Sequence, residues 1–517
     1  MASVIVIGAG FSGMAAAIEL LRGGHDVTVL ERGPDVGGVW RENAYPGAAC
    51  DVPSAYYSLS YSPNPRWSRR YAPQAEILGY LRDNADKYGL YERIRFGVTV
   101  REARFDDDAH RWTVRLDDGE DQDVVAELDA DFLVPAVGQL STPILADLPG
   151  HNGFTGAAFH SAQWDESIDL AGKKIAVIGT GASSIQIVPE IAQVARSVTV
   201  YQRSAPHILP RPDSRLTRAH AILARRAPVT LRAQRLLWQG VTEGFTAALH
   251  YAPPVARALE LACLAFMRAQ AGDAELYRTI RPEHPLGCKR VLFSNRYIPA
   301  LRRPNVELVT DRIARVGATS ITTADEVQRE TDVIVYGTGF AAGTFLDHVS
   351  IRGRDGAELS AAWADGPRAH LGIAVPGFPN MFLMYGPNTN LGSGSIVAML
   401  ECQARYIRQA LAAIPDGAAA EVLPEVEAAY DDALQARLAD GVWSRCDSWY
   451  VTESGRVVSN WPGTVREYRH RTDRFDPAEY TLHPAPWDAP DDVRRDGASL
   501  TARSAIPKMD GVNGVPR

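Results

Sequence analysis

The 517-residue sequence is poor in cysteine, with five residues and no Cys-x-x-Cys pair. The five are scattered along the chain at positions 50, 263, 288, 402 and 446. This spacing indicates neither a zinc site nor a redox disulfide, so we expect no metal and a structural role for Cys288. Few, scattered cysteines are also typical of a protein in the reducing cytoplasm.

A long hydrophobic run is missing as well. The most apolar later stretch, residues 256–269, is interrupted by Arg257, Glu260 and Arg268 and is too short to span a bilayer. A first strand is predicted from Val4, without the basic and apolar regions of a secretory signal before it. We therefore expect a cytoplasmic protein with no integral membrane segment. A helix lying on a membrane surface is an alternative that the sequence does not favour.

An excess of positive charge is absent too. The net charge is −8 and the pI is about 5.9, and no basic patch stands out, which argues against nucleic acid as a partner. Hydrophobic residues make up 46% of the chain and charged residues 22%, which is enough for a large buried core. The length predicts two to four domains.

The first informative pattern is a glycine-rich loop near the N-terminus. An apolar strand at residues 4–7 is followed by Gly-x-Gly-x-x-Gly and a helix, and Glu31 stands at the end of the next strand, residues 27–30. Such loops let the backbone approach a pyrophosphate, and the acid binds a ribose hydroxyl. Because a carboxylate repels a 2′-phosphate, this site suits FAD or NAD. The residues expected at the cofactor are Gly8, Gly10, Phe11, Ser12, Gly13, Glu31 and Arg32.

A second loop of the same kind follows the strand predicted at residues 174–178. After the next strand, residues 197–201, the place of Glu31 is taken by Arg203, which can hold a 2′-phosphate through its charge and its paired N–H groups. A solvated arginine at a strand end is the alternative. The contrast assigns FAD to the first loop and NADPH to the second. The residues expected at NADP are Thr180, Gly181, Ala182, Ser183, Ser184, Arg203 and Ser204.

Three further motifs lie outside these loops. Residues 37–51 read G-G-x-W-x-x-x-x-Y-P-G-x-x-x-D, residues 154–165 read F-x-G-x-x-x-H-x-x-x-W-D, and residues 287–290 read G-x-K-R. Each has a purely structural interpretation: a turn aspartate before Pro53, an interdomain loop with a packed tryptophan and a surface histidine, and a solvated Lys-Arg pair. Their combination in one chain favours a functional interpretation.

Together these motifs resemble those of the flavin-dependent (type I) Baeyer–Villiger monooxygenases, within the flavin-containing monooxygenases. The resemblance covers roughly residues 4–470. It implies that Arg290 is the active arginine over the flavin, that Asp51 orients it, and that Lys289 helps to bind the NADP phosphate. Trp449 matches the tryptophan of a mobile loop that closes over NADP. The matching fingerprint positions are Phe154, Gly156, His160 and Trp164; the other residues implied at FAD are Gly38, Val39, Trp40, Tyr57 and Val100.

The implied fold is α/β, with two Rossmann-like domains of which the FAD domain is of the glutathione-reductase type. We expect a β-meander within residues 95–137, a strand at 380–384, and helices at 396–412 and 425–438. Residues 213–286 depart from the α/β pattern, and we interpret them as a helical insertion over the active site. We assign its apolar stripes, one of which contains Leu236 and Leu237, to the core; a surface for a partner is the alternative. The expected domains are FAD-binding 1–145 and 375–485, NADP-binding 146–212 and 287–374, the insertion 213–286, and a flexible tail 486–517.

The activity implied by the resemblance is an NADPH- and O2-dependent conversion of a ketone into an ester or lactone through a C4a-peroxyflavin. Aromatic and aliphatic residues around the expected pocket favour a lipophilic ketone. A related flavin monooxygenase that oxidises nitrogen or sulfur is the first alternative, and a nucleotide-binding protein without turnover is a remote one. A disulfide reductase would need a cysteine pair after the first helix, which the sequence lacks.

Overall fold

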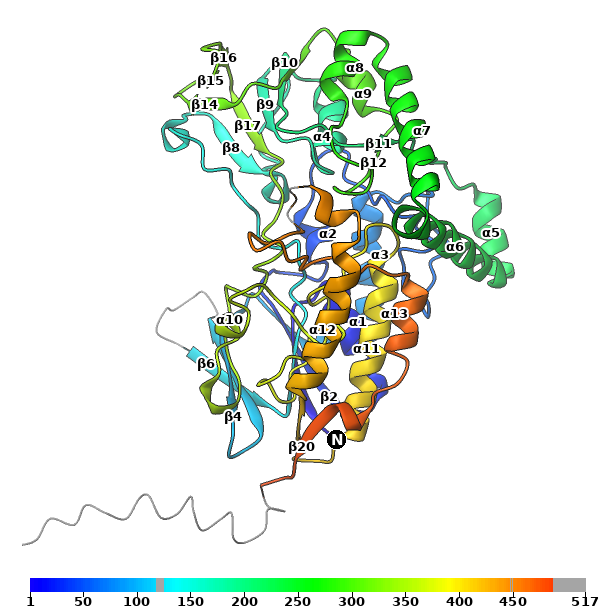
Figure 1. The fold of residues 1–517 in the computed structure, drawn as a ribbon, viewed down its shortest axis with the longest axis vertical. Helices are drawn as coiled ribbons and strands as arrows, with labels where there is room; N and C mark the ends of the chain where they lie inside the picture. Colours follow the sequence, from blue (N-terminus) through cyan, green and yellow to red (C-terminus); the bar gives the residue numbers. More distant parts are fainter. Residues whose placement is uncertain (118–124, 447, 449, 487–517) are drawn as a thin grey trace, which may run out of the picture.

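The computed structural model describes residues 1–117, 125–446, 448 and 450–486. It contains two parallel sheets, one in the lower half of the molecule and one in the upper half, with a group of helices along one side (Figure 1). The predicted flexible tail, from residue 487 onward, and the predicted loop residue Trp449 lie outside the described residues.

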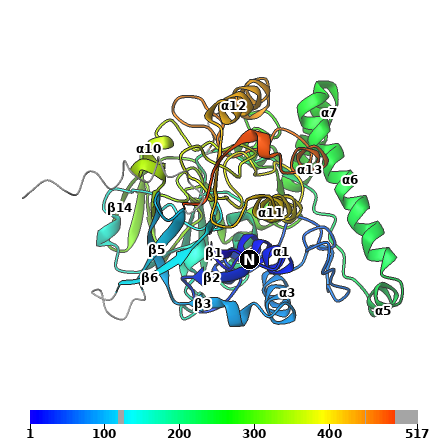
Figure 2. The ribbon, with the colours of Figure 1, turned by 90° about the horizontal axis from the view of Figure 1, so that it is seen from below.

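The first sheet carries the first glycine loop. Its strand order is β3-β2-β1-β7, and its strands are β1 (Ser3–Ile7), β2 (Asp26–Glu31), β3 (Ile94–Phe96) and β7 (Phe132–Pro135). Strand β1 consists almost entirely of buried β-branched residues, as expected for a strand covered on both faces. Helix α1 (Phe11–Arg22) covers one face and packs against α11 (Ile396–Ala413), which returns from the far end of the chain (Figure 2).

The predicted meander is present as a second, mostly antiparallel sheet of order β18-β4-β5-β6. Its strands are β4 (Thr99–Asp106), β5 (Arg111–Asp117), β6 (Val125–Ala130) and β18 (Ser350–Arg352). Strand β18 and the neighbouring residues Phe345 and Leu359 share a core with β4 and β5. The prediction that residues 287–374 lie wholly in the NADP domain was therefore wrong, because the chain packs on the first unit from about residue 345.

The upper sheet carries the second glycine loop and has the order β13-β10-β9-β17-β8. Its strands are β8 (Ala157–His160), β9 (Lys174–Ile178), β10 (Ser197–Tyr201), β13 (Val306–Val309) and β17 (Val333–Tyr336). Two helices, α4 (Ser184–Ile191) and α9 (Tyr297–Leu301), pack on it in one apolar cluster. A small antiparallel sheet lies beside it, with strands β14 (Ile313–Val316), β15 (Ser320–Thr323) and β16 (Gln328–Glu330).

The predicted helical insertion forms the outer helices at the right of Figures 1 and 2. Its elements are α5 (Arg218–Arg226), α6 (Val229–Tyr251), α7 (Pro253–Ala271) and α8 (Ala274–Ile280), with β11 (Ile208–Leu209) and β12 (Leu292–Phe293) pairing at its base. The prediction that its apolar stripes belong to the core was wrong: Leu236 and Leu237 are 67% and 61% exposed. Among the described residues, no helix has the length and apolar character that a membrane span requires.

The C-terminal part completes the first unit. Residues 380–384, predicted as a strand, hydrogen-bond along β7 as isolated bridges, because Asn380 and Tyr385 have positive φ and end the extended backbone on both sides. The remaining elements are α2 (Val39–Glu42), α3 (Gln74–Lys87), α10 (Leu359–Ala362), α12 (Pro424–Ala439), α13 (Val465–Arg471), β19 (Ala419–Val422) and β20 (Tyr480–His483).

Candidate active site

The two glycine loops have the same backbone construction. Gly8 has φ +105°, and a Cβ there would lie 2.8 Å from the carbonyl oxygen of Ala136; a Cβ at Gly13 would collide with the carbonyl of Gly8. Gly179 has φ +107°, and a Cβ there would lie 2.5 Å from the carbonyl oxygen of Gly337. Only glycine fits these tight turns, and each turn directs the N-terminus of a helix, α1 or α4, towards the expected pyrophosphate.

Ser184, predicted in place of the third glycine, is fully buried as the first residue of α4. A Cβ on Gly337 would collide with the Ser184 hydroxyl. Only glycine therefore fits at residue 337, directly after β17, while Ser184 occupies its present position. Gly181 and Ala182 are exposed, and the hydroxyl of Thr180 donates to the carbonyl of Ser204 at 3.0 Å. The second loop is thus tied to the strand end where the 2′-phosphate is expected.

Glu31 organises the first loop. It is 5% exposed, and its carboxylate accepts hydrogen bonds from the backbone N–H groups of Ala9 and Gly33, both at 2.8 Å. The guanidinium of Arg41 lies 3.1 Å from the same carboxylate, a contact that the sequence analysis missed. Arg32 is exposed and pairs with Glu42 at 2.9 Å, so it borders the site from outside.

An aromatic cluster stands beside the first loop. Phe11 and Trp40 both pack edge-on against Tyr57, with ring centroids 5.3 and 5.7 Å apart, and the Trp40 indole N–H donates to the Tyr57 hydroxyl at 3.1 Å. Gly38 and Val39 hold Trp40 there, because Gly38, with φ +51°, caps α2 and packs its backbone against that of Gly10. Burial raises the pKa of Tyr57 well above its usual range, so its hydroxyl stays neutral.

Val100 was proposed to contact the adenine. It is buried within β4, and the chain just before it bonds to the end of β2: the N–H of Val98 donates to the carbonyl of Glu31 at 3.1 Å. The backbone at the start of β4 is therefore next to the ribose-binding acid. The adenine contact itself stays a prediction.

The expected phosphate-binding groups come together at the end of β10. The Lys289 ammonium donates to the Ser204 hydroxyl at 3.2 Å, although the two residues are 85 positions apart. Arg203 is exposed beside them. A cationic, open corner of this kind fits the 2′-phosphate of NADP and would not be needed for NAD.

Arg290 and Asp51 form an ion pair between the two units. The guanidinium donates through Nη2 and Nε to Asp51 Oδ2, at 2.6 and 3.2 Å. The Asp51 carboxylate raises the pKa of Arg290 above its already high value, so this arginine stays charged. Asp51 is therefore more than a turn residue, because its side chain forms an ion pair with Arg290, 239 residues further along the chain.

A small pocket opens at this ion pair. It has walls from α6, from the G-x-K-R segment, from the turn before α11 and from the segment before residue 450. Its lining residues are Thr246, Leu249, His250, Gly287, Lys289, Arg290, Val291, Gly392, Ser393, Trp443 and Tyr450. The helical insertion does border the site, as expected, but the sequence analysis did not identify the individual lining residues of α6.

Burial shapes the electrostatics of this pocket. It lowers the pKa of His250, which stacks on Trp443 at 4.3 Å between centroids, to about 4, and it raises the pKa of Tyr450 to about 12. Both side chains are neutral near pH 7. Burial likewise raises the pKa of Tyr385, so this side chain, which interacts electrostatically with Arg290, is also neutral. The charged groups that line the pocket are therefore the Arg290 guanidinium, which is paired with Asp51, and the Lys289 ammonium.

A disulfide links Cys288, next to Lys289, to Cys446. The cysteine spacing indicated no redox disulfide, and it could not indicate this bond, because the two cysteines are 158 residues apart and only the fold brings them together. The bond joins the active-arginine segment to the segment that carries Tyr450. Cys50, Cys263 and Cys402 are free and buried.

The fingerprint residues 154–165 form the edge strand β8 and the turn after it. His160 is fully buried, not on the surface; its Nδ1 accepts from the N–H of Ala162 at 3.1 Å, and its ring packs edge-on against Phe340 at 5.3 Å. Trp164 packs against Phe159, and a Cβ on Gly156 would strike both the Phe154 ring and the Asp332 carbonyl. The motif thus fixes β8 against β17, where the chain crosses back to the first unit.

Gln186 of α4 clamps the two units together. Its amide oxygen accepts from the Tyr45 hydroxyl at 3.1 Å and from the N–H of Ala49 at 3.2 Å, and its amide N–H donates to the Ala49 carbonyl at 3.0 Å. The Y-P-G motif is the sequence signal for this contact, because the hydroxyl of its tyrosine requires a hydrogen-bond partner. The clamp holds the second loop in register with the Asp51 segment.

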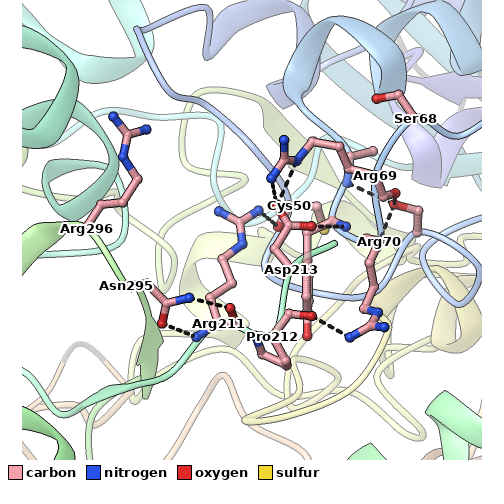
Figure 3. Close-up of polar contacts among 12 residues, drawn as sticks. Cys50, Ser68, Arg69, Arg70, Arg211, Pro212, Asp213, Asn295 and Arg296 are labelled. Atoms are coloured by element: carbon pink, nitrogen blue, oxygen red, sulfur yellow. Dashed lines mark hydrogen bonds and ion pairs between the residues drawn. The ribbon is translucent and has the colours of Figure 1, made fainter. Parts of the chain in front are cut away.

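A second junction holds the base of the insertion. In Figure 3 the Arg69 guanidinium points at Asp213, with Nε 2.8 Å from the carboxylate, and Arg211 reaches the Cys50 carbonyl at 2.8 Å. The Asn295 side-chain amide donates to the Arg211 carbonyl at 2.7 Å and accepts from the Arg211 backbone N–H at 3.1 Å. The insertion therefore starts from a fixed point beside Asp51.

Known proteins share this arrangement. Residues 1–239 match the family model described as flavin-binding monooxygenase-like. Over 491 residues the chain is 40% identical to a Baeyer–Villiger monooxygenase of Streptomyces coelicolor, and the match covers 93% of both chains. This chain belongs to the Baeyer–Villiger monooxygenase family.

Solved structures with bound nucleotide cofactors have the same fold. An oxidized steroid monooxygenase bound to NADP is 31% identical, with a TM-score of 0.83 over 93% of this chain and 99% of that one. The OTEMO complex with FAD and NADP is 28% identical, with a TM-score of 0.83 over the same shares. The predicted α/β fold with two dinucleotide-binding domains, the cofactors FAD and NADP(H), and the enzyme class are therefore confirmed.

The residues present fit both cofactors of such a monooxygenase. Glycine-only turns leave room for two pyrophosphates, one at α1 and one at α4. Glu31, at the end of β2, is negatively charged and suits a ribose hydroxyl of FAD. Lys289, which bonds Ser204 after β10, is positively charged and suits the 2′-phosphate of NADP. The chain is an FAD-dependent monooxygenase of the Baeyer–Villiger type that uses NADPH and O2.

Proposed function

We propose that this enzyme oxidises lipophilic ketones to esters or lactones, with Arg290 as the catalytic cation and Asp51 as the residue that positions it. The observation that carries the proposal is the 2.6 Å ion pair at the floor of a pocket whose walls include Leu249, Val291 and Trp443. Such walls favour an apolar substrate, and Arg290, with Lys289 beside it, places positive charge where the substrate carbonyl would enter.

When bound, FAD accepts a hydride from NADPH and activates O2 for insertion beside the carbonyl carbon. Arg290 would stabilise the negative charge that develops on oxygen. Two of its nitrogens bond Asp51, while Nη1 makes no hydrogen bond within the described residues and is free to donate. A fixed donor stabilises such charge more strongly than a mobile one, because it does not have to reorient during the reaction.

Asp51 acts through Arg290. Its carboxylate fixes the plane of the guanidinium and balances its charge between turnovers. Tyr385 interacts electrostatically with Arg290 but stays neutral, because burial raises its pKa; its hydroxyl donates to Asn390 and its backbone N–H donates to Gln403, both at 2.9 Å. The remaining site assignments, including the phosphate contacts of Arg203 and the adenine contact of Val100, are part of this proposal.

The test is product analysis with isotopic oxygen. The purified enzyme is supplied with FAD, NADPH and ¹⁸O2 and offered a long-chain ketone, a small polar ketone, a tertiary amine and a sulfide. We expect an ester that carries one ¹⁸O atom, formed faster from the long-chain ketone. An N-oxide or sulfoxide without any ester would contradict the proposal and favour nitrogen or sulfur oxygenation.

We also propose that the enzyme works in the cytoplasm, where reduced thiols such as Cys50, Cys263 and Cys402 persist. The Cys288–Cys446 disulfide is then formed only after lysis or under oxidative conditions. Cells are quenched in acid and their thiols alkylated before extraction. Mass spectrometry that finds Cys288 and Cys446 mostly alkylated supports this location, and a fully formed disulfide argues against it.

A further inference from the structure

The outer face of α5 and α6 is apolar and exposed. On α6 the exposed residues Val229, Leu236, Leu237 and Val241 follow one stripe of the helix, and α5 adds exposed Ile222 and Leu223. The side chain of Val229 is 67% exposed, as is that of Leu236. Contiguous exposed apolar surface is uncommon on a protein that has no partner there.

The segment that carries this face is cationic, although no basic patch stood out from the sequence. Between Asp213 and Glu243 the sequence has six arginines and no acidic residue, in a chain of net charge −8. Arg235 points inward and pairs with Glu401 at 3.0 Å. The other five are exposed, and none has a carboxylate within 4.0 Å in the described part of the chain; they are Arg215, Arg218, Arg225, Arg226 and Arg232.

The orientation of this face is fixed by the inner side of α6. There Leu231 and Thr246 are buried, and Arg235 also bonds the backbone carbonyl of Ser58. The base of the insertion is held at Asp213 (Figure 3). Both views place α5 and α6 at the margin of the molecule, with no other described helix or strand outside them (Figures 1 and 2). The stripe therefore faces outward.

We propose that the outer face of α5 and α6 docks on an anionic lipid surface. An amphipathic helix binds a bilayer by lying in its interface, with leucine and valine among the acyl chains and arginine at the headgroups. Arginine stems reach past apolar neighbours to place their charge in the headgroup layer. Helix α6, about 34 Å long at 1.5 Å per residue, would lie along the surface.

A second copy of the chain fits this face less well. A two-fold contact brings the same patch of each subunit together. The five unpaired arginines would then face five others, and α5 and the exposed stripe of α6 offer no carboxylate to balance them. Anionic headgroups supply that charge. The proposal concerns surface binding and holds whichever substrate the enzyme oxidises.

The test is vesicle sedimentation of the FAD-loaded enzyme. We expect it to sediment with vesicles made of equal amounts of phosphatidylcholine and phosphatidylglycerol, to stay in solution with phosphatidylcholine alone, and to be released by salt. Arg225→Gln with Arg226→Gln should weaken binding about 30-fold, at about fivefold per arginine. Leu236→Gln with Leu237→Gln should weaken it at least about 30-fold through lost apolar burial.

The matched control is Arg312→Gln with Arg315→Gln. It removes the same charge from exposed residues at β14, on the opposite side of the molecule (Figure 1), and should bind as the parent does. Flavin content and thermal melting check that each variant is folded. Absence of sedimentation with the anionic vesicles overturns the proposal, as does binding that neither helix variant weakens. A dimer seen by light scattering that Leu236→Gln with Leu237→Gln abolishes, without vesicle binding, assigns the face to a second copy.

Discussion

At the level of single side chains, the site depends on which groups are charged and which are neutral. Arg290 is charged at any working pH and Asp51 raises its pKa further, whereas His250, Tyr385 and Tyr450 are held neutral by burial. A fixed cation beside neutral pocket walls is an arrangement that stabilises a developing oxyanion.

Arg290→Ala should separate cofactor turnover from oxygen insertion. We expect NADPH oxidation to change only a few-fold, while ester formation falls by about 10²–10³, the usual loss when one fixed oxyanion donor is removed. NADPH consumption, ester and hydrogen peroxide are measured together. Arg296→Ala is the control, because its guanidinium pairs with Glu190 and does not line the pocket. Equal ester yields from Arg290→Ala and the parent would remove Arg290 from the mechanism.

Arg203→Gln tests whether Arg203 recognises the 2′-phosphate of the dinucleotide at the second loop. A charge-assisted contact with phosphate contributes about 1.5–3 kcal/mol, so KM for NADPH should rise about 10- to 100-fold. KM for NADH should stay the same, since NADH has no 2′-phosphate. If both KM values rise together, Arg203 supports the fold of the strand end and does not recognise the phosphate.

His207 should make the enzyme less stable in acid. Burial, and then the neighbouring His284, lower its pKa from 6.5 to about 4, and neither of its nitrogens has a partner within the described residues. The unfolded chain therefore binds the proton more tightly, and stability present above pH 6.5 is lost as the pH falls towards 4, by up to about 3 kcal/mol. In His207→Gln, urea midpoints at pH 7 and pH 4.5 should lie closer together than in the parent. An unchanged gap would mean that His207 titrates normally.

At the level of helices, strands and their links, local patterns in the sequence were reliable and distant contacts were not. The two glycine loops were predictable because their conformation and their ligand both depend on a few consecutive residues. The stripe containing Leu236 and Leu237 was also recognised, but periodicity shows only that residues share a face and not what that face meets. The exposed side of α6 was therefore assigned to the core.

The pairing of Cys288 with Cys446, and that of β18 with β4, could not be predicted for a related reason. Each depends on how the chain crosses between the units, not on spacing. The Asp51–Arg290 contact spans a similar distance and was predicted only because both residues lie in motifs of a recognisable family. Gln186 lies in no such motif and was missed.

The Cys288–Cys446 link should stabilise the pocket wall. A cross-link that closes a long loop typically contributes about 2–4 kcal/mol. We expect a dithiol reductant to lower the melting temperature of the parent, and Cys446→Ser to melt at the reduced value with or without reductant. A parent that melts identically in both conditions, with the bond intact beforehand by mass spectrometry, would contradict a stabilising role.

At the level of the whole molecule, catalysis requires the two nucleotide loops to keep one mutual position. Gln186 is the direct polar contact from α4 to the segment that precedes Asp51. Arg69, Arg211 and Asp213 hold the second junction (Figure 3). These contacts would hold the residues that bind NADPH and those that bind FAD at the separation that hydride transfer requires.

Gln186→Leu should therefore slow flavin reduction without loss of either cofactor. We expect the anaerobic bleaching of bound FAD by NADPH to slow about tenfold, since a misplacement of about 1 Å can reduce a rate about 100-fold. Gln193→Leu, just past the end of α4, is the control, because its amide bonds only Pro189 and Glu190. Normal reduction in Gln186→Leu would show that other contacts set the geometry.

The order of the chain has a consequence for biosynthesis. The upper sheet is complete once β17 ends at Tyr336, whereas α1 of the first unit packs against α11, which ends at Ala413, and shares a core with residues as late as Tyr480. A nascent chain emerging from the ribosome can thus assemble its NADP-binding half while its N-terminal loop still waits for a covering helix. Loading of FAD would then be among the last events before release, and prematurely terminated chains would bind nicotinamide nucleotide but not flavin.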